Sequence, residues 1–131
     1  MRPKFNIDGA CIVELGRVGI GGDLRNSKGE VLCSFSAFVG SVEAATAELL
    51  AIHKACLLCV SKTSLWGRCI YFESNSKEVV SWVNDEEFSN LPLVEVIFDI
   101  RTMLVQLSCS LVCFAPRDSN SLVDDLAKRG L

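Results

Sequence analysis

The stretch that decides the fold is KFNIDGA, residues 4–10. In it the apolar residues Phe5 and Ile7 alternate with polar ones. An alternation with a period of two is typical of a β-strand, which we expect over residues 4–14. Aspartate is depleted in strands, and a carboxylate on a half-buried element is costly unless it is paired or binds a metal. Asp8 is therefore a candidate functional residue, with an exposed acid on an edge strand as the alternative.

Two further strands are expected close behind the first. Residues 18–25 and 30–39 have strand patterns, and the turn signal NSKG separates them at residues 26–29. Three strands joined by short turns predict an antiparallel meander. The second strand contains glycines that allow bulges or a close approach of another chain segment, at Gly19, Gly21 and Gly22.

The rest of the chain alternates helices with strands. Ser41 is the expected N-cap of a helix that ends near residue 60, and Pro92 suits the first turn of another helix. A strand over residues 108–115 should turn Leu111 and Cys113 inward. The expected elements are helices at about 42–60, 76–83, 92–107 and 119–129, with strands at 68–73 and 108–115.

This order, βββ-α-β-α-α-β-α, predicts an α/β fold with a mixed five-stranded sheet flanked by helices. The strand at 68–73 follows a helix, so it should pair parallel to the first strand through a right-handed crossover. A chain of 131 residues fits one domain over 1–131.

The composition limits the partners. The net charge is −3 and the pI about 5.1, which argues against strong electrostatic binding of a nucleic acid duplex. A nuclease whose acidic site is neutralised by bound metal stays compatible with this charge. No apolar run is long enough to span a membrane, so no membrane partner is expected. Seven cysteines without a secretory signal favour a reducing compartment, the cytoplasm or nucleus, and Cys56 and Cys59 are expected in the core.

Two other acids join Asp8 as candidates. Glu48 lies on an alanine-rich helix, at the rim of its apolar stripe, where a solvated helix residue is the simple alternative. Asp124 opens the last predicted helix, where it could merely favour the helix dipole. If the three carboxylates meet in space, they predict a site for a divalent metal ion.

The element order and these acids resemble the ribonuclease H fold, and in particular the plant-type, reverse-transcriptase-associated ribonuclease H-like domains. No single motif is specific, but the resemblance covers nearly the whole chain in the expected order. The matching segments are FNIDGA (5–10), GIGGDLRNSKGE (19–30), AELLAI (47–52), ESNSK (73–77), PRDSN (116–120) and DDLAK (124–128).

The resemblance implies an endonuclease, of retrotransposon-derived type, that hydrolyses RNA in RNA/DNA hybrids with two Mg²⁺ ions, or Mn²⁺ in their place. It implies that Asp8 bridges both ions, that Glu48 binds the ion on the leaving-group side, and that Asp124 binds the ion on the nucleophile side. Asn75 takes the fourth catalytic position. Substrate contacts are implied at Gly9, Ala10, Ser76 and Asn120.

The sequence departs from the family pattern at several positions. The family motif Glu-Ser-Asp-Ser has Asn75 in place of its aspartate, and an amide offers a carbonyl oxygen but no negative charge. We therefore expect a large loss of rate; the change can be natural or introduced to trap a substrate, and a plain structural amide is the other interpretation of Asn75. Phe114 stands where the family often has histidine. Ala44 and Ala45 stand where distant bacterial members have asparagines, and the basic substrate-binding protrusion of those members is also missing.

Two functions follow from this pattern. The first is the metal-dependent ribonuclease, impaired by Asn75. The second is a catalytically inactive ribonuclease H-like module that binds nucleic acid or a protein partner. The sequence leaves open the oligomeric state and whether the chain is part of a longer polypeptide.

Overall fold

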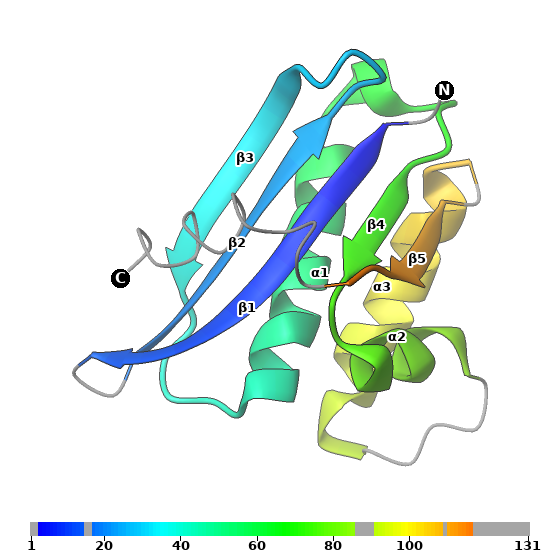
Figure 1. Cartoon of the computed structure of the whole chain (residues 1–131). Helices are drawn as coiled ribbons and strands as arrows, with labels where there is room; N and C mark the ends of the chain where they lie inside the picture. The colour runs from blue at the N-terminus through cyan, green and yellow to red at the C-terminus, as the bar shows by residue number, and fades with distance from the viewer. Residues whose placement is uncertain (1–2, 15–16, 86–90, 109, 117–131) are drawn as a thin grey trace.

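The computed structural model describes residues 3–14, 17–85, 91–108 and 110–116, with the backbone alone for residues 9–14 and 91. Within these residues, five strands form one sheet in the order β3-β2-β1-β4-β5 (Figure 1). The strands are β1 (Lys4–Glu14), β2 (Arg17–Arg25), β3 (Val31–Phe38), β4 (Tyr71–Ser74) and β5 (Leu111–Phe114).

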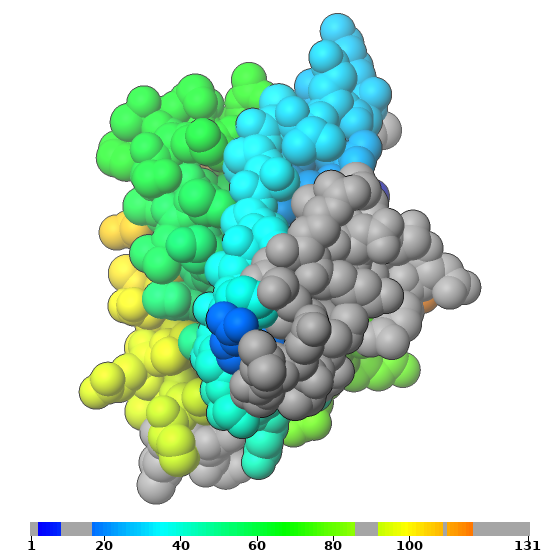
Figure 2. Space-filling model, turned by 90° about the vertical axis from the view of Figure 1, so that its left-hand side faces the viewer, coloured from blue at the N-terminus to red at the C-terminus, as the bar shows by residue number. Residues whose placement is uncertain are grey.

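Helix α1 (Ala44–Val60) packs against β1, β2 and β4, and α3 (Val94–Gln106) packs against α1 on the same side of the sheet (Figure 1). Figure 2 shows this layer from the edge of the sheet, with β3 as a column and the helices beside it. The shorter α2 (Lys77–Asn84) lies beyond the end of β4 (Figure 1). Single 3₁₀ turns cover Thr63–Leu65 and Leu91–Leu93. None of the helices in the described part of the chain is long and apolar enough to cross a membrane.

The predicted topology is confirmed wherever the structure describes the chain. β1, β2 and β3 form the antiparallel meander, and β4 pairs parallel with both β1 and β5. The mixed sheet thus has an antiparallel half and a parallel half, and β1 lies at the junction. The helix predicted over residues 119–129 falls outside the described residues.

The core explains why the first strand is so informative. Phe5 is fully buried and packs against Phe72 and Phe35, with ring centroids 5.8 and 5.9 Å away. A Cβ atom on Gly22 would lie 2.7 Å from the Phe35 ring and 2.9 Å from the Asn6 carbonyl oxygen. Gly22 is therefore required by a close approach, as the glycine-rich second strand predicts.

Three local predictions are wrong. Helix α1 begins after Glu43, not Ser41, and has no side-chain cap. Pro92 lies in a 3₁₀ turn before α3 rather than in its first turn. On β5 the inward face carries Val112, whereas Leu111 is 51% exposed. Periodicity gives the alternation of a four-residue strand but not which of its two faces packs against the core.

Arg101 fixes the position of α2 against α3. Its guanidinium donates to the carbonyl oxygens of Val83 at 2.8 Å and Trp82 at 3.1 Å, and also to that of Asp85. These carbonyls lie at the C-terminal end of α2. A side chain of α3 thus anchors the C-terminal end of the helix that begins beside Asn75.

Candidate active site

A cavity of about 210 Å³ opens where the end of β4 meets β1 and α1. Three separate segments of the chain line it, which places two of the predicted acids and the predicted amide around one space. The lining residues are Asp8, Ala44, Ala45, Glu48, Asn75, Ser76 and Glu78.

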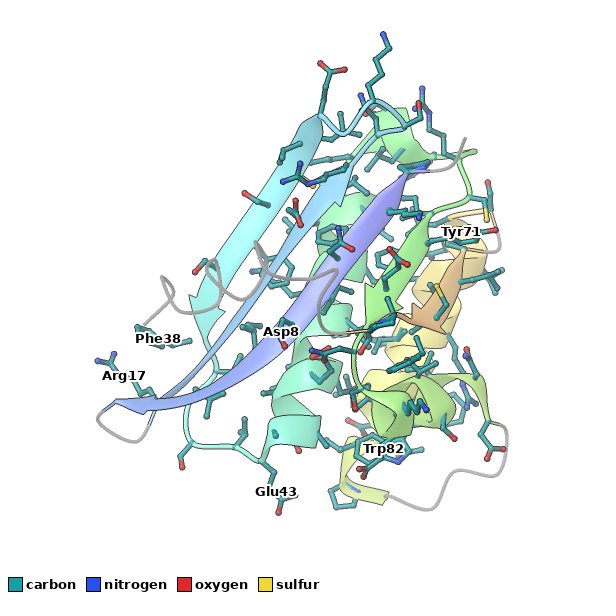
Figure 3. All side chains as sticks on the ribbon, in the orientation of Figure 1. Asp8, Arg17, Phe38, Glu43, Tyr71 and Trp82 are labelled. Carbon is teal, nitrogen blue, oxygen red and sulfur yellow. The ribbon has the colours of Figure 1, made fainter. Side chains whose placement is uncertain are left out.

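Asp8 lies midway along β1 (Figure 3), where its neighbour on β2 is Gly21. Its side chain is only 1% exposed, and its Oδ2 atom has no hydrogen-bond partner among the described residues. Nearly all buried polar atoms in proteins have a partner, and a buried carboxylate oxygen without one is costly. A proton or a cation in the cavity would satisfy this unpartnered oxygen. The alternative of an exposed edge-strand acid is wrong, because β1 is central and Asp8 is buried.

Glu48 is buried as well, at 3% exposure. Its Oε1 atom accepts a hydrogen bond from the Ser74 hydroxyl at 2.8 Å, and that hydroxyl accepts one from the Ser76 backbone N–H at 3.2 Å. The alternative, that Glu48 is a solvated helix residue, is therefore wrong. The alternation of β4 would have placed Ser74 on the same buried face as Phe72, but a serine beside a predicted acid carries no strong signal in a sequence.

Asn75 and Ser76 connect β4 to α2. Asn75 lines the cavity and is partly buried. Ser76 is the N-cap of α2, and its hydroxyl accepts from the Val79 backbone N–H at 3.3 Å. The Ser76 hydroxyl thus already has a structural role, which a substrate contact would have to share.

The residues around the cavity fit a hard divalent cation. Carboxylate and amide oxygens are the ligands that Mg²⁺ prefers, and the unpartnered oxygen of Asp8 supplies one. Within the residues that the structure describes, no three side chains of the His, Cys, Asp and Glu types lie close enough together to hold an ion. Asp8 and Glu48 are the buried acids of this cavity, and position 75 adds a neutral amide.

The other predicted site residues are described only in part or not at all. Asp124 and Asn120 fall outside the described residues. Gly9 and Ala10 continue β1, where they pair with Ile20 and Gly19.

The departures from the family pattern lie near this cavity. Ala44 and Ala45 line it with methyl groups, which offer a substrate no hydrogen bond. Phe114, at the end of β5, is 43% exposed, and the Lys77 ammonium lies 5.0 Å from the centre of its ring. A cation–π contact thus stands where a histidine is frequent in the family.

Cys56 and Cys59 belong to the core, as predicted, whereas Cys33, Cys69 and Cys113 are only partly buried. Cys56 and Cys59 are both fully buried, and burial raises the pKa of Cys59 to about 12. Each therefore stays a neutral thiol at physiological pH. His53 is separate from the cavity, and its Nε2 atom lies 3.1 Å from Asp99 Oδ2.

Comparison with known proteins places this geometry in a family. The sequence matches the family described as reverse transcriptase-like over residues 6–130, and the chain belongs to that family. No curated protein matches the sequence significantly.

Several solved structures share the fold. LC11-RNase H1, solved in complex with an RNA/DNA hybrid, has a TM-score of 0.85 at 22% identity, over 98% of this chain and 95% of that one. The RNase H1 of the halophilic archaeon Halobacterium salinarum has a TM-score of 0.85 at 21% identity, over 99% and 97%. The prototype foamy virus protease-reverse transcriptase has a TM-score of 0.80 at 19% identity, and the match covers 98% of this chain but 20% of that one. The fold is therefore the ribonuclease H fold.

Proposed function

We propose that this chain is a ribonuclease H-type nuclease domain that hydrolyses the RNA strand of RNA/DNA hybrids with Mg²⁺, slowly because of Asn75. The observation that carries the proposal is the buried, unpartnered Oδ2 atom of Asp8 in a cavity shared with Glu48. Folding alone does not favour such an oxygen, whereas binding of a cation would satisfy it.

The chain's own residues have distinct parts in this proposal. Asp8 and Glu48 would hold the metal, joined by Asp124 from the predicted last helix. Ser74 keeps the Glu48 carboxylate in one orientation through its hydrogen bond, as outer-shell partners of metal ligands do. Bound Mg²⁺ would supply polarisation of the scissile phosphate and a lowered pKa of the attacking water.

Asn75 weakens this site without removing it. Its carbonyl oxygen can still reach into the cavity that it lines, but it adds no negative charge. Less negative charge lowers the affinity for a divalent cation, and misplacement of the metal lowers the rate. We propose that Asn75 is the main cause of slow turnover.

The substrate class is supported by the neighbours rather than by the charge of this chain. LC11-RNase H1, with the same fold, was solved with an RNA/DNA hybrid. We propose contacts to the hybrid at Gly9, Ala10, Ser76 and Asn120. With a net charge of −3, the electrostatic part of the binding should be weak.

A second function is favoured by Asn75 itself. A ribonuclease H-like module that kept its fold but lost turnover would bind nucleic acid or a protein partner without cleavage. Such a module has no need of a buried, unpartnered Asp8, which is why the enzyme is the preferred proposal.

A cleavage assay with matched substrates tests the enzyme proposal. The same RNA sequence is end-labelled and offered as a hybrid with DNA, as duplex RNA and as a single strand, with Mg²⁺ and with EDTA. We expect Mg²⁺-dependent cuts in the hybrid RNA alone and none by Asp8→Asn. Equal cleavage by Asp8→Asn would show that the activity comes from a contaminant or another site.

A further inference from the structure

We propose that Glu78 supplies the negative charge that Asn75 lacks, and that it binds the metal ion together with Asp8 and Glu48. This inference rests on the proposed function, because it assigns a third carboxylate to the same metal site.

The position of Glu78 suggests this role. It lies three residues after Asn75, in the first turn of α2, and it lines the same cavity as Asp8, Glu48 and Asn75. Asp8 and Glu48 are buried parts of the cavity lining, whereas Glu78 is an exposed part of it. A longer side chain one helical turn later can therefore reach the space that a carboxylate at position 75 would have occupied.

The charge around the cavity is the reason why a third carboxylate would strengthen metal binding. The Oδ2 atom of Asp8 has no partner among the described residues although it is buried, so the cavity already presents an unsatisfied ligand to a cation. Affinity for a hard divalent ion rises with the number of charged ligands. Asn75 leaves Asp8 and Glu48 as the buried charges of the cavity, and Glu78 brings a further charge to its lining.

Glu78 is free to turn toward an ion. Among the residues that the structure describes, its carboxylate has no hydrogen bond and no ion pair, unlike Asp23, which pairs with Arg25 at 2.6 Å. Exposed side chains change rotamer within nanoseconds. Binding would therefore draw Glu78 inward from its exposed position, which accounts for the lack of a preformed three-acid cluster in the described residues.

The competing explanation is that Glu78 merely favours the helix dipole. Glu95 serves as a matched control, because it is also an exposed acid in the first turn of a helix, α3. Glu95 lines a different cavity, together with His53 and Asp99. Replacing either glutamate removes one charge from a helix N-terminus, but only Glu78 borders the cavity with Asp8.

The test is calorimetric titration with Mg²⁺, and with Mn²⁺ as the second probe, in a double-mutant cycle. The proteins are the unchanged chain, Glu78→Gln, Asn75→Asp and the double variant, with Glu95→Gln as the control and thermal melts to confirm folding. We expect Glu78→Gln to weaken binding about 10- to 100-fold in the unchanged chain. In the Asn75→Asp background the loss should be less than about threefold, since the introduced aspartate then supplies the charge. Glu95→Gln should bind as the unchanged chain does.

Two results would overturn the inference while the proposed function survives. One is unchanged affinity in Glu78→Gln, and the other is an equal loss in both backgrounds, which would mean a general effect of charge. Glu78→Asp adds a further check, because it keeps the charge at the helix terminus but shortens the reach, and full affinity in this variant would also count against a ligand role. If neither the unchanged chain nor Asn75→Asp binds metal, the proposed function fails, and the inference fails with it.

Discussion

The Ser74 hydroxyl donates a hydrogen bond of 2.8 Å to Glu48 Oε1, and this contact joins the end of β4 to α1. Both residues are buried. The contact holds one acid of the candidate site in place and also connects two elements that lie far apart in the sequence. It therefore couples the stability of the fold to the geometry of the site.

Replacing Ser74 by alanine should destabilise the protein by about 1–3 kcal/mol, because it removes a hydrogen bond from a buried carboxylate. Urea denaturation measures this change, and Mg²⁺ affinity should fall in the same variant. Ser81→Ala is the control, since Ser81 is exposed on α2 and alanine there should be neutral or slightly stabilising. Equal stability of the two variants would mean that the bond to Glu48 contributes nothing.

Asp8→Asn should make the metal-free protein more stable than the unchanged chain. The substitution removes a buried charge whose Oδ2 atom has no partner among the described residues, at the expense of metal binding. Thermal melts in EDTA should show the gain. Mg²⁺ at one hundred times its Kd should stabilise the unchanged chain by about 2.7 kcal/mol and so raise its melting temperature. The melting temperature of Asp8→Asn should not change. A variant that is less stable in EDTA would contradict the idea that Asp8 is unsatisfied without a cation.

Arg101→Lys should loosen the end of α2. Lysine keeps the charge but lacks the planar guanidinium that reaches the carbonyls of Val83 and Trp82 together. We expect a loss of about 1–2 kcal/mol in the free energy of unfolding and faster amide hydrogen exchange in α2. Arg68→Lys, at an exposed position, should change neither quantity. If both variants exchange alike, Arg101 does not anchor α2.

Stability should fall as the pH rises above about 9. Burial raises the pKa of Cys59 from 9.0 to about 12, so the unfolded thiol ionises at a lower pH than the folded one. Between the two pKa values, the folded state keeps the proton that the unfolded state has lost. Each such thiol therefore lowers the free energy of unfolding by up to about 1.4 kcal/mol for each pH unit in this range. Burial raises the pKa of Cys56 in the same direction. Denaturation between about pH 8 and 10.5 should show this slope, and Cys59→Ala should reduce it.

Much of the fold is predictable from the sequence, because strand alternation, turn residues and helical stripes are local signals. The meander and the parallel pairing of β4 follow from these signals. The buried face of β5 and the start of α1 are not predictable in this way. On β5, Leu111 is exposed and its neighbour Val112 is buried, although the alternation alone allows either face to be the inner one. Helix α1 begins without a side-chain cap.

The candidate site is predictable only in part. The sequence singles out Asp8 as an acid within a strand, Glu48 as an acid beside the apolar stripe of a helix, and Asn75 as an amide within the family motif. The fold brings all three to one cavity. Ser74 and Glu78 carry no such signal. A serine at a strand end and an acid in the first turn of a helix are both common, so their roles emerge only from what they lie beside.

Cleavage of an end-labelled RNA/DNA hybrid by this chain and by Asn75→Asp, under single-turnover conditions with Mg²⁺, tests the nuclease proposal most directly. We expect slow cleavage by the unchanged chain and faster cleavage by Asn75→Asp, on the order of a hundredfold or more. If neither protein cuts the hybrid although both are folded and bind Mg²⁺, the chain is not a nuclease, and the role of a binding module replaces it.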